Sequence, residues 1–231
     1  MRKVQTKSGF SIEIIFEDDD VLVINKPAGL VVHPKTPNDD EDSIQSVFSN
    51  HLSGGEVGRE GIVHRLDRET SGVMILAKNK SSLEFLQSQF ANREVTKEYI
   101  TLVWGHPKYN EARLELPIRR SRKSPAKMEI HSSGKESVSE YQVLERYNDY
   151  SLISISLHTG RTHQIRVQFA HTGHPVVGDR LYGKRIIPNG LVRQFLHAQK
   201  LCLKLPQHTK TSCFEAELPN DLQLFLESLD A

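Results

Sequence analysis

Continuous apolar runs mark the segments that we expect at the centre of a β-sheet. Residues 73–77 are five apolar residues in succession, and residues 21–24 form a second run of this kind. Such short runs are typical of strands that are buried on both faces. In 151–157 isoleucine and leucine alternate with serine, a pattern that predicts a strand with one buried face. The remaining predicted strands are 11–16, 96–104, 113–116, 136–147, 195–205 and 212–218.

Apolar residues at helical spacing predict four helices between these strands. We expect Ser43 or Asp42 to cap the first helix, Asn79 the second and Thr162 the third, because short polar side chains accept hydrogen bonds from the first helical N–H groups. The expected helices are 43–51, 79–91, 163–172 and a terminal helix that opens at 219–221.

The order of these elements predicts an α+β fold. Many strands follow one another through hairpin-like or irregular connections, and few helices lie between them. This order favours a mixed, largely antiparallel sheet with flanking helices and loops over a doubly wound fold. We expect a short N-terminal extension over 1–10 and a single domain over 11–231, with two sub-lobes that share a continuous sheet.

Composition excludes several classes of protein. The longest stretch without Lys, Arg, Asp or Glu is 43–55, which is too short and too polar to span a bilayer. No apolar signal core follows the basic N-terminus, so the cytoplasm is the expected location. The only two cysteines, Cys202 and Cys213, make neither a disulfide framework nor a zinc pattern. The histidines lack the short repeated spacings of structural zinc sites, so we expect no metal.

Charge is distributed unevenly, although the net charge is only +1. Residues 118–127 contain five cations, among them Arg119 and Arg120, and no acid. Residues 214–231 contain five acids and no base, and further acids lie at 17–20 and 39–42. This separation suits one cationic face that meets a polyanion. Charge alone favours the simpler interpretation of two solvated surfaces.

Asp67 is the residue most suggestive of chemistry. It lies directly before the apolar run 73–77, on a predicted loop that enters the middle of the sheet. A carboxylate in such a place needs partners, because an unpaired buried charge is costly. Arg65 and Arg68 are close enough in sequence to favour its ionised form.

Arg166 is a candidate partner for Asp67. It lies beside the buried stripe of Ile165 and Phe169 in the first turn of the predicted helix 163–172, where a cation opposes the helix dipole. Either the side chain extends to solvent or it reaches a buried carboxylate. The same helix start carries Arg161 and His163, which together with free N–H groups can hold a phosphate.

Tyr99 faces away from Ile100, Leu102 and Trp104 in the predicted strand 96–104. The simple interpretation is a half-exposed strand aromatic, and the functional one is a side chain in a cleft.

The motif His64-Arg65-Leu66-Asp67-x-x-Thr70-Ser71-Gly72-x-x-x-x-Ala77-Lys78 resembles the signature of the RluA-type RNA pseudouridine synthases. The stretches 25–29, 97–99, 160–166 and 173–179 are similar to other motifs of that family. The resemblance extends from about residue 12 to 220, nearly the whole chain.

This resemblance implies a pseudouridine synthase-like fold with a central active-site cleft. It implies an isomerase that needs no cofactor and no metal and that converts uridine in RNA to pseudouridine. Asp67 would act as a nucleophile on the sugar or as a base at C2′, Tyr99 would stack on the target base, and Arg166 would pair with Asp67. Arg65 would fill the space that the flipped nucleotide leaves, a step needed because a stacked base is out of reach.

The expected partner is structured RNA, a stem-loop of ribosomal or transfer RNA. We expect the protein to be a monomer and to bind no membrane. We expect His64, Thr70, Arg161 and His163 to contact this RNA. Some members of the family carry an added small RNA-binding domain before the catalytic one, and we expect none here. RNA selection would then depend on the catalytic domain and on loop 118–127, with Arg119 and Arg120. The alternatives are a non-catalytic RNA-binding module and a metal-independent RNA hydrolase that uses Asp67.

Overall fold

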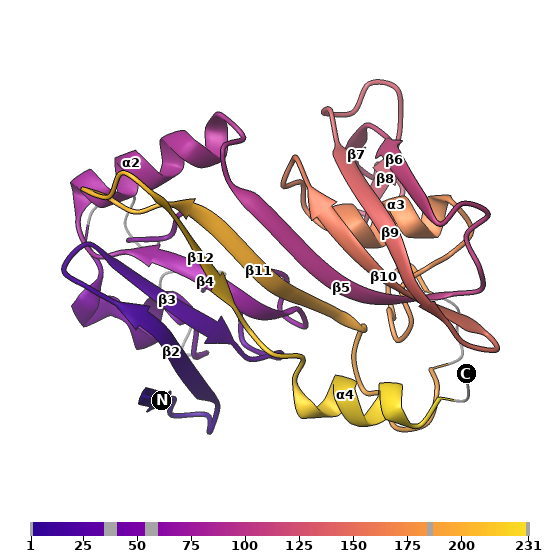
Figure 1. The fold of residues 1–231 in the computed structure, drawn as a ribbon, viewed down its shortest axis with the longest axis horizontal. Helices are drawn as coiled ribbons and strands as arrows, with labels where there is room; N and C mark the ends of the chain where they lie inside the picture. The colour runs from indigo at the N-terminus through magenta and orange to yellow at the C-terminus, as the bar shows by residue number, and fades with distance from the viewer. Residues whose placement is uncertain (1, 35–40, 54–59, 184–186, 230–231) are drawn as a thin grey trace. The chain divides into compact units, whose positions relative to one another are not determined.

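A computed structural model describes residues 2–34, 41–53, 60–183 and 187–229 (Figure 1). The chain divides into two compact units. The first comprises Met1–Thr96 and Ala198–Glu217, and the second comprises Lys97–His197 and Leu218–Ala231.

The sheet of the first unit has the strand order β1-β2-β3-β4-β11, and β12 also pairs with β11. Neighbouring strands are antiparallel wherever their register is described. Every residue of β4 is buried, as the apolar run 73–77 predicts for a strand covered on both faces. The strands are β1 (Arg2–Gln5), β2 (Ser11–Glu17), β3 (Val21–Lys26), β4 (Ser71–Ala77), β11 (Leu196–Lys204) and β12 (Thr211–Glu215).

Helix α2 (Lys80–Ala91) covers the core of this unit. Its Leu83 and Leu86 are buried in one apolar cluster with residues of β3, β4 and β11. The side chain of Asn79 accepts a hydrogen bond from the backbone of Ser82, so the predicted cap is confirmed. The first predicted helix is shorter than expected, because α1 (Ile44–Val47) with its Ser43 cap gives way to a 3₁₀ turn at Ser49–His51.

The second unit contains an antiparallel sheet of β5 (Thr96–Trp104), β10 (Tyr150–Leu157), β9 (Val138–Arg146) and β6 (Glu111–Glu115), in that order. Each face of β5 contacts a different apolar cluster. Val103 and Tyr99 pack with residues of α3 (Gln164–His171), whereas Ile100 and Leu102 pack with residues of α4 (Asn220–Glu227). The two-sided pattern predicted for this strand is therefore confirmed.

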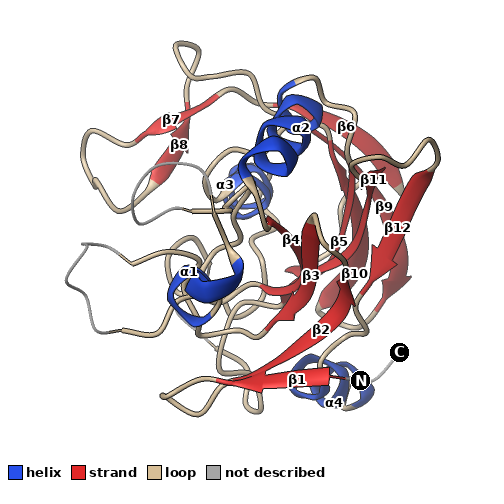
Figure 2. Ribbon diagram, turned by 90° about the vertical axis from the view of Figure 1, so that its left-hand side faces the viewer, coloured by secondary structure: helices blue, strands red, loops and turns tan. Residues whose placement is uncertain are grey.

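Two features of the second unit differ from the prediction. The basic segment expected as a loop is a separate two-stranded hairpin, β7 (Ile118–Arg120) and β8 (Met128–Ile130) (Figure 2). Thr162 does not cap α3. The cap position belongs to His163, which has a left-handed backbone with φ of 55° and no side-chain capping bond.

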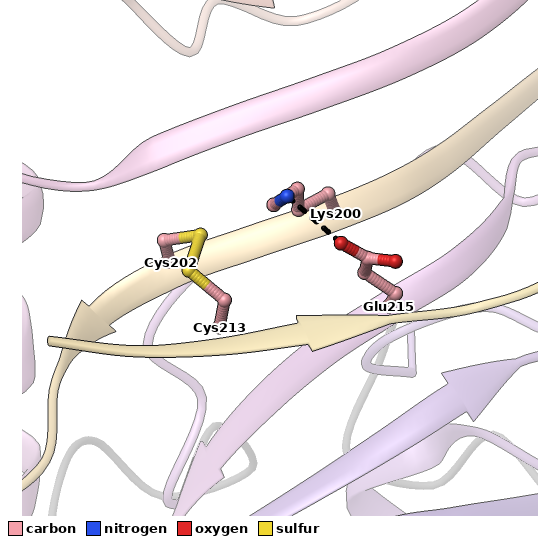
Figure 3. Close-up of a disulfide and its surroundings, with 4 residues drawn as sticks. All are labelled: Lys200, Cys202, Cys213 and Glu215. Carbon is pink, nitrogen blue, oxygen red and sulfur yellow. Dashed lines mark ion pairs between the residues drawn. A yellow bond between two sulfur atoms is a disulfide. The ribbon is translucent and has the colours of Figure 1, made fainter.

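The sequence showed no disulfide framework, yet the two cysteines form one disulfide. Cys202 of β11 and Cys213 of β12 lie directly opposite each other, and their sulfur atoms are bonded (Figure 3). On the same two strands, Lys200 forms an ion pair with Glu215. Two cysteines eleven positions apart contain no disulfide pattern by themselves, and only the hairpin register brings them together.

No helix within the described part of the chain has both the length and the apolar character needed to cross a bilayer. Over the same residues, His, Cys, Asp and Glu side chains do not gather in groups of three or more that suit a metal ion.

Candidate active site

Asp67 lies on the irregular segment that leads into β4 and is half-buried. The backbone of the following residue, Arg68, is held in place by β3 and by the turn after β3. The carbonyl oxygen of Arg68 accepts hydrogen bonds from the backbone N–H of Gly29, at 2.9 Å, and from the ammonium of Lys26, at 3.0 Å. The N–H of Thr70 bonds to the carbonyl of Asp67 at 3.1 Å. The carboxylate is thus carried by a loop with a fixed backbone, as a preorganised site requires.

Lys26 is fully buried, and sequence reasoning gave it no role. Its ammonium donates to three carbonyl oxygens, those of Pro27 and Leu30 at 2.8 Å each and that of Arg68 at 3.0 Å. A buried cation is tolerated only with such partners. The available signal was a lysine between a buried strand and Pro-Ala-Gly, a place where a solvated lysine is not expected.

Other residues of the motif pack within the first unit. The Nε2 atom of His64 accepts a hydrogen bond from Ile75 at 3.1 Å, and its ring stacks on Phe90. Thr70 is buried, whereas Arg65 is exposed. Arg68 forms a bidentate ion pair with Glu41. RNA contacts of His64, Thr70 and Arg65 stay predictions.

Tyr99 and Arg166 belong to the second unit. Tyr99 is half-buried on β5 and packs against the cluster that contains Ile165 and Phe169 of α3. Arg166 projects from the first turn of the same helix and is only 8% exposed. One apolar cluster therefore supports both the β5 strand that carries Tyr99 and the α3 helix that carries Arg166.

The guanidinium of Arg166 forms two hydrogen bonds with Asp179. Nε donates to Oδ2 at 2.7 Å and Nη2 donates to Oδ1 at 3.0 Å. The side chain of Asp179 is fully buried. Burial by itself raises the pKa of this carboxyl, but the hydrogen bonds and the charge of Arg166 outweigh it, so the pKa lies below the usual value.

Sequence reasoning missed Asp179 as a partner of Arg166, although it ends the family-like stretch 173–179 and follows the apolar pair Val176-Val177 closely. The predicted pairing of Arg166 with Asp67 joins residues of different units and stays a prediction.

The start of α3 has partners within the protein. The Nε atom of Arg161 donates to the carbonyl of Glu136 at 2.8 Å, and its backbone N–H donates to the side chain of Gln164 at 3.0 Å. The Nδ1 atom of His163 lies 2.9 Å from the hydroxyl of Tyr182. The phosphate site expected at Arg161 and His163 stays a prediction.

The β7–β8 hairpin presents cations at its connecting turn. Arg120, Arg122 and Lys123 are exposed. Arg119 differs from them, because it lies opposite Glu129 in the hairpin register and donates to its carboxylate at 2.9 Å. Hydrogen bonds from Ser121 and Arg119 lower the pKa of Glu129. The acid that offsets Arg119 lies two residues beyond the segment 118–127, so the segment by itself contains no acid.

Comparison with known proteins identifies the family to which the chain belongs. The model of the RNA pseudouridylate synthase family matches residues 20–171, which include Asp67, Tyr99 and Arg166. The chain belongs to this family. It is therefore an RNA pseudouridine synthase, an isomerase that converts uridine in RNA to pseudouridine. The family match supports neither a non-catalytic RNA-binding module nor an RNA hydrolase.

Individual pseudouridine synthases resemble the chain over most of its length. An uncharacterized RNA pseudouridine synthase of Bacillus subtilis, YlyB, is 40% identical over 94% of this chain and 73% of its own. The ribosomal large subunit pseudouridine synthase D of Zymomonas mobilis is 38% identical over 94% of this chain and 73% of its own. The solved structure of human RNA pseudouridylate synthase domain containing 4 has a TM-score of 0.73 at 26% identity, over 95% of this chain and 94% of that one. These likenesses confirm the predicted α+β fold with a largely antiparallel sheet.

Proposed function

We propose that this synthase isomerises a uridine in a stem-loop of large-subunit ribosomal RNA. The relatives of Zymomonas mobilis, Haemophilus ducreyi and Yersinia pestis, at 36–38% identity, are named as ribosomal large subunit pseudouridine synthase D. The observation that carries the proposal is the complete Asp67 motif on a loop that Lys26 and Gly29 anchor through one carbonyl. Such anchoring suits a group that must meet one atom of a flipped nucleotide.

The reaction rearranges bonds within one nucleoside. The bond from C1′ to N1 of uracil breaks, the detached base rotates, and a bond from C1′ to C5 forms, while C5 loses a proton and N1 gains one. Asp67 acts as the nucleophile on the sugar or as the base at C2′. Tyr99 stacks on the base and assists removal of the C5 proton. The uridine leaves its stack first, at a cost of a few kcal/mol that stacking on Tyr99 and insertion of Arg65 offset.

Arg166 keeps Asp67 ionised and oriented, because a nearby cation favours the charged form of a carboxyl. Asp179 holds one edge of the guanidinium through Nε and Nη2. Because Asp67 belongs to the first unit and Tyr99 and Arg166 to the second, this role requires both units. We therefore assign both units to one catalytic domain over 11–231, built on a continuous sheet.

RNA binds through the β7–β8 hairpin and through side chains near the site. The cations Arg120, Arg122 and Lys123 contact phosphates, and Arg119 contributes less because Glu129 offsets its charge. His64, Thr70, Arg161 and His163 contact the target stem-loop. The enzyme acts in the cytoplasm as a monomer.

The test uses ribosomal RNA labelled with tritium at uridine C5. The wild-type protein should release the label without strand cleavage, and Asp67→Asn should abolish release while RNA binding persists. Asp149→Asn, an exposed aspartate in the β9–β10 turn, is the matched control and should leave release unchanged. Turnover by Asp67→Asn would refute the assignment of the carboxylate. Release from transfer RNA but not from ribosomal RNA would refute the proposed substrate.

A further inference from the structure

Tyr182 contacts both the basic hairpin and the helix that carries Arg166. Its hydroxyl accepts a hydrogen bond from the backbone N–H of Met128, the first residue of β8, at 2.6 Å. The same hydroxyl lies 2.9 Å from Nδ1 of His163, the cap residue of α3. A backbone N–H only donates, so the hydroxyl accepts from Met128, and its hydrogen bond with His163 runs in the direction that the imidazole tautomer sets. One oxygen atom therefore joins β8 to the start of α3.

The ring of Tyr182 contacts cations from the same two elements. The Cζ atom of Arg166 lies 5.3 Å from the ring centroid, and Nζ of Lys127, at the end of the basic turn, lies 5.9 Å from it. Both distances are within the range of cation–π attraction. The His163 ring meets the Tyr182 ring edge-on at 5.6 Å. The Tyr182 ring therefore contacts both the Arg166 guanidinium and the cation directly before β8.

Asp179 binds both Tyr182 and Arg166. Its Oδ1 atom accepts hydrogen bonds from the backbone N–H of Tyr182 and from Nη2 of Arg166, both at 3.0 Å. The carboxylate is fully buried, so water does not compete for these bonds. The tyrosine backbone and the guanidinium are thus held by the same oxygen.

We propose that Tyr182 is a positioning residue that couples RNA binding at the β7–β8 hairpin to the orientation of Arg166. The inference rests on the proposed function, in which the hairpin binds phosphates and Arg166 orients Asp67. Phosphates that bind the exposed cations Arg122 and Lys123 fix the hairpin, and Tyr182 transmits that position to α3. The hydroxyl therefore contributes to the rate of the chemical step and little to RNA affinity.

The first test removes one atom by Tyr182→Phe. Single-turnover tritium release at saturating RNA should slow about five- to tenfold, because the hydroxyl loses its bonds to both Met128 and His163, while the RNA dissociation constant stays within about twofold. Tyr147→Phe is the matched control, since its hydroxyl donates to Glu145 at 2.7 Å and contacts neither α3 nor the hairpin in the described structure. It should leave the rate unchanged. An unchanged rate for Tyr182→Phe would overturn the inference.

The second test measures the coupling itself. In the wild-type background, Arg122→Ala with Lys123→Ala should lower RNA affinity and also the rate at saturation. In the Tyr182→Phe background the same two alanine substitutions should lower RNA affinity and leave the rate at saturation unchanged, because the connection to Arg166 is already broken. Equal rate effects in the two backgrounds would overturn the coupling.

A third variant guards against a folding defect in Tyr182→Phe. His163→Asn removes the imidazole that bonds to the Tyr182 hydroxyl and leaves the Met128 bond in place, and asparagine tolerates the left-handed backbone of position 163. It should give a similar loss of rate, and wild-type turnover by His163→Asn would count against the inference. If the wild-type protein itself releases no tritium, the proposed function fails, whereas turnover that is insensitive to Tyr182→Phe refutes only the coupling.

Discussion

The ammonium of Lys26 lies 3.0 Å from the carbonyl oxygen of Arg68, although 42 positions separate the two residues in the chain. This hydrogen bond connects the end of β3 to the carbonyl of Arg68, the residue directly after Asp67. A charged donor is suited to the task, because it satisfies three carbonyl oxygens at once, one of them in a buried and two in a partly buried place. Lys26 thus fixes the backbone of the loop that carries Asp67 from within the core.

Replacement of Lys26 by methionine should destabilise the protein. The side chains are similar in length, but three carbonyl oxygens lose the charged donor of a fully buried side chain, so we expect the free energy of unfolding to fall by about 2–4 kcal/mol. Urea denaturation measures the change. Lys80→Met, at a position whose side chain is 79% exposed, is the control and should change stability by less than about 0.5 kcal/mol. Equal stability of the two variants would show that the hydrogen bonds of Lys26 contribute nothing.

Asp179 makes stability depend on pH. Its pKa is lowered in the folded protein, so its contribution is complete above the unfolded value of 3.8 and is lost as pH falls through the folded pKa. Asp179→Asn leaves Arg166 without its buried partner and should cost about 3–5 kcal/mol at pH 7. The difference in unfolding free energy between wild type and variant should narrow as pH falls below 3.8, because the unfolded wild-type chain then binds a proton that the folded carboxyl, with its lower pKa, does not yet bind. A difference that is constant from pH 7 to pH 3 would contradict this account.

The cations of the hairpin should determine the salt dependence of RNA binding. Alanine at Arg120, Arg122 and Lys123 should weaken binding and reduce the slope of log K against log salt by roughly 0.7–0.9 for each phosphate that the variant no longer neutralises. Filter binding over a salt series measures the slope. Alanine at the exposed Arg2, Lys3 and Lys7 removes the same charge elsewhere and should leave the slope near wild type. Similar slopes for the two triple variants would show that net charge, and not the hairpin, determines binding.

Reduction of the Cys202–Cys213 bond should lower stability modestly. The bond closes a short loop across one antiparallel strand pair. The loss of chain entropy in the unfolded state limits the stabilisation by such a bond to about 3 kcal/mol. Thermal unfolding with and without dithiothreitol measures the loss, and Cys202→Ser with Cys213→Ser should reproduce it and remove the sensitivity to dithiothreitol. A wild-type melting temperature that dithiothreitol leaves unchanged would mean that the bond contributes no stability.

Local patterns predicted most of the elements correctly. The apolar run 73–77, the alternation in 151–157 and the Asn79 cap each depend on neighbours in sequence, and each is confirmed. The hairpin was missed because its two strands of three residues are too short for either pattern to register. Thr162 failed as a cap because His163 takes a left-handed backbone, which sequence spacing does not reveal.

The sequence by itself determined the fold class, the family and the residues proposed for chemistry, because hydrophobic periodicity and a long contiguous motif are both local properties of the chain. Only the tertiary structure decided that Asp179 pairs with Arg166, that Lys26 anchors the Asp67 loop and that Cys202 faces Cys213. Each of these interactions depends on strand register or on burial. A buried charge takes whichever partner the packed chain brings within hydrogen-bonding distance, and no local pattern specifies that partner.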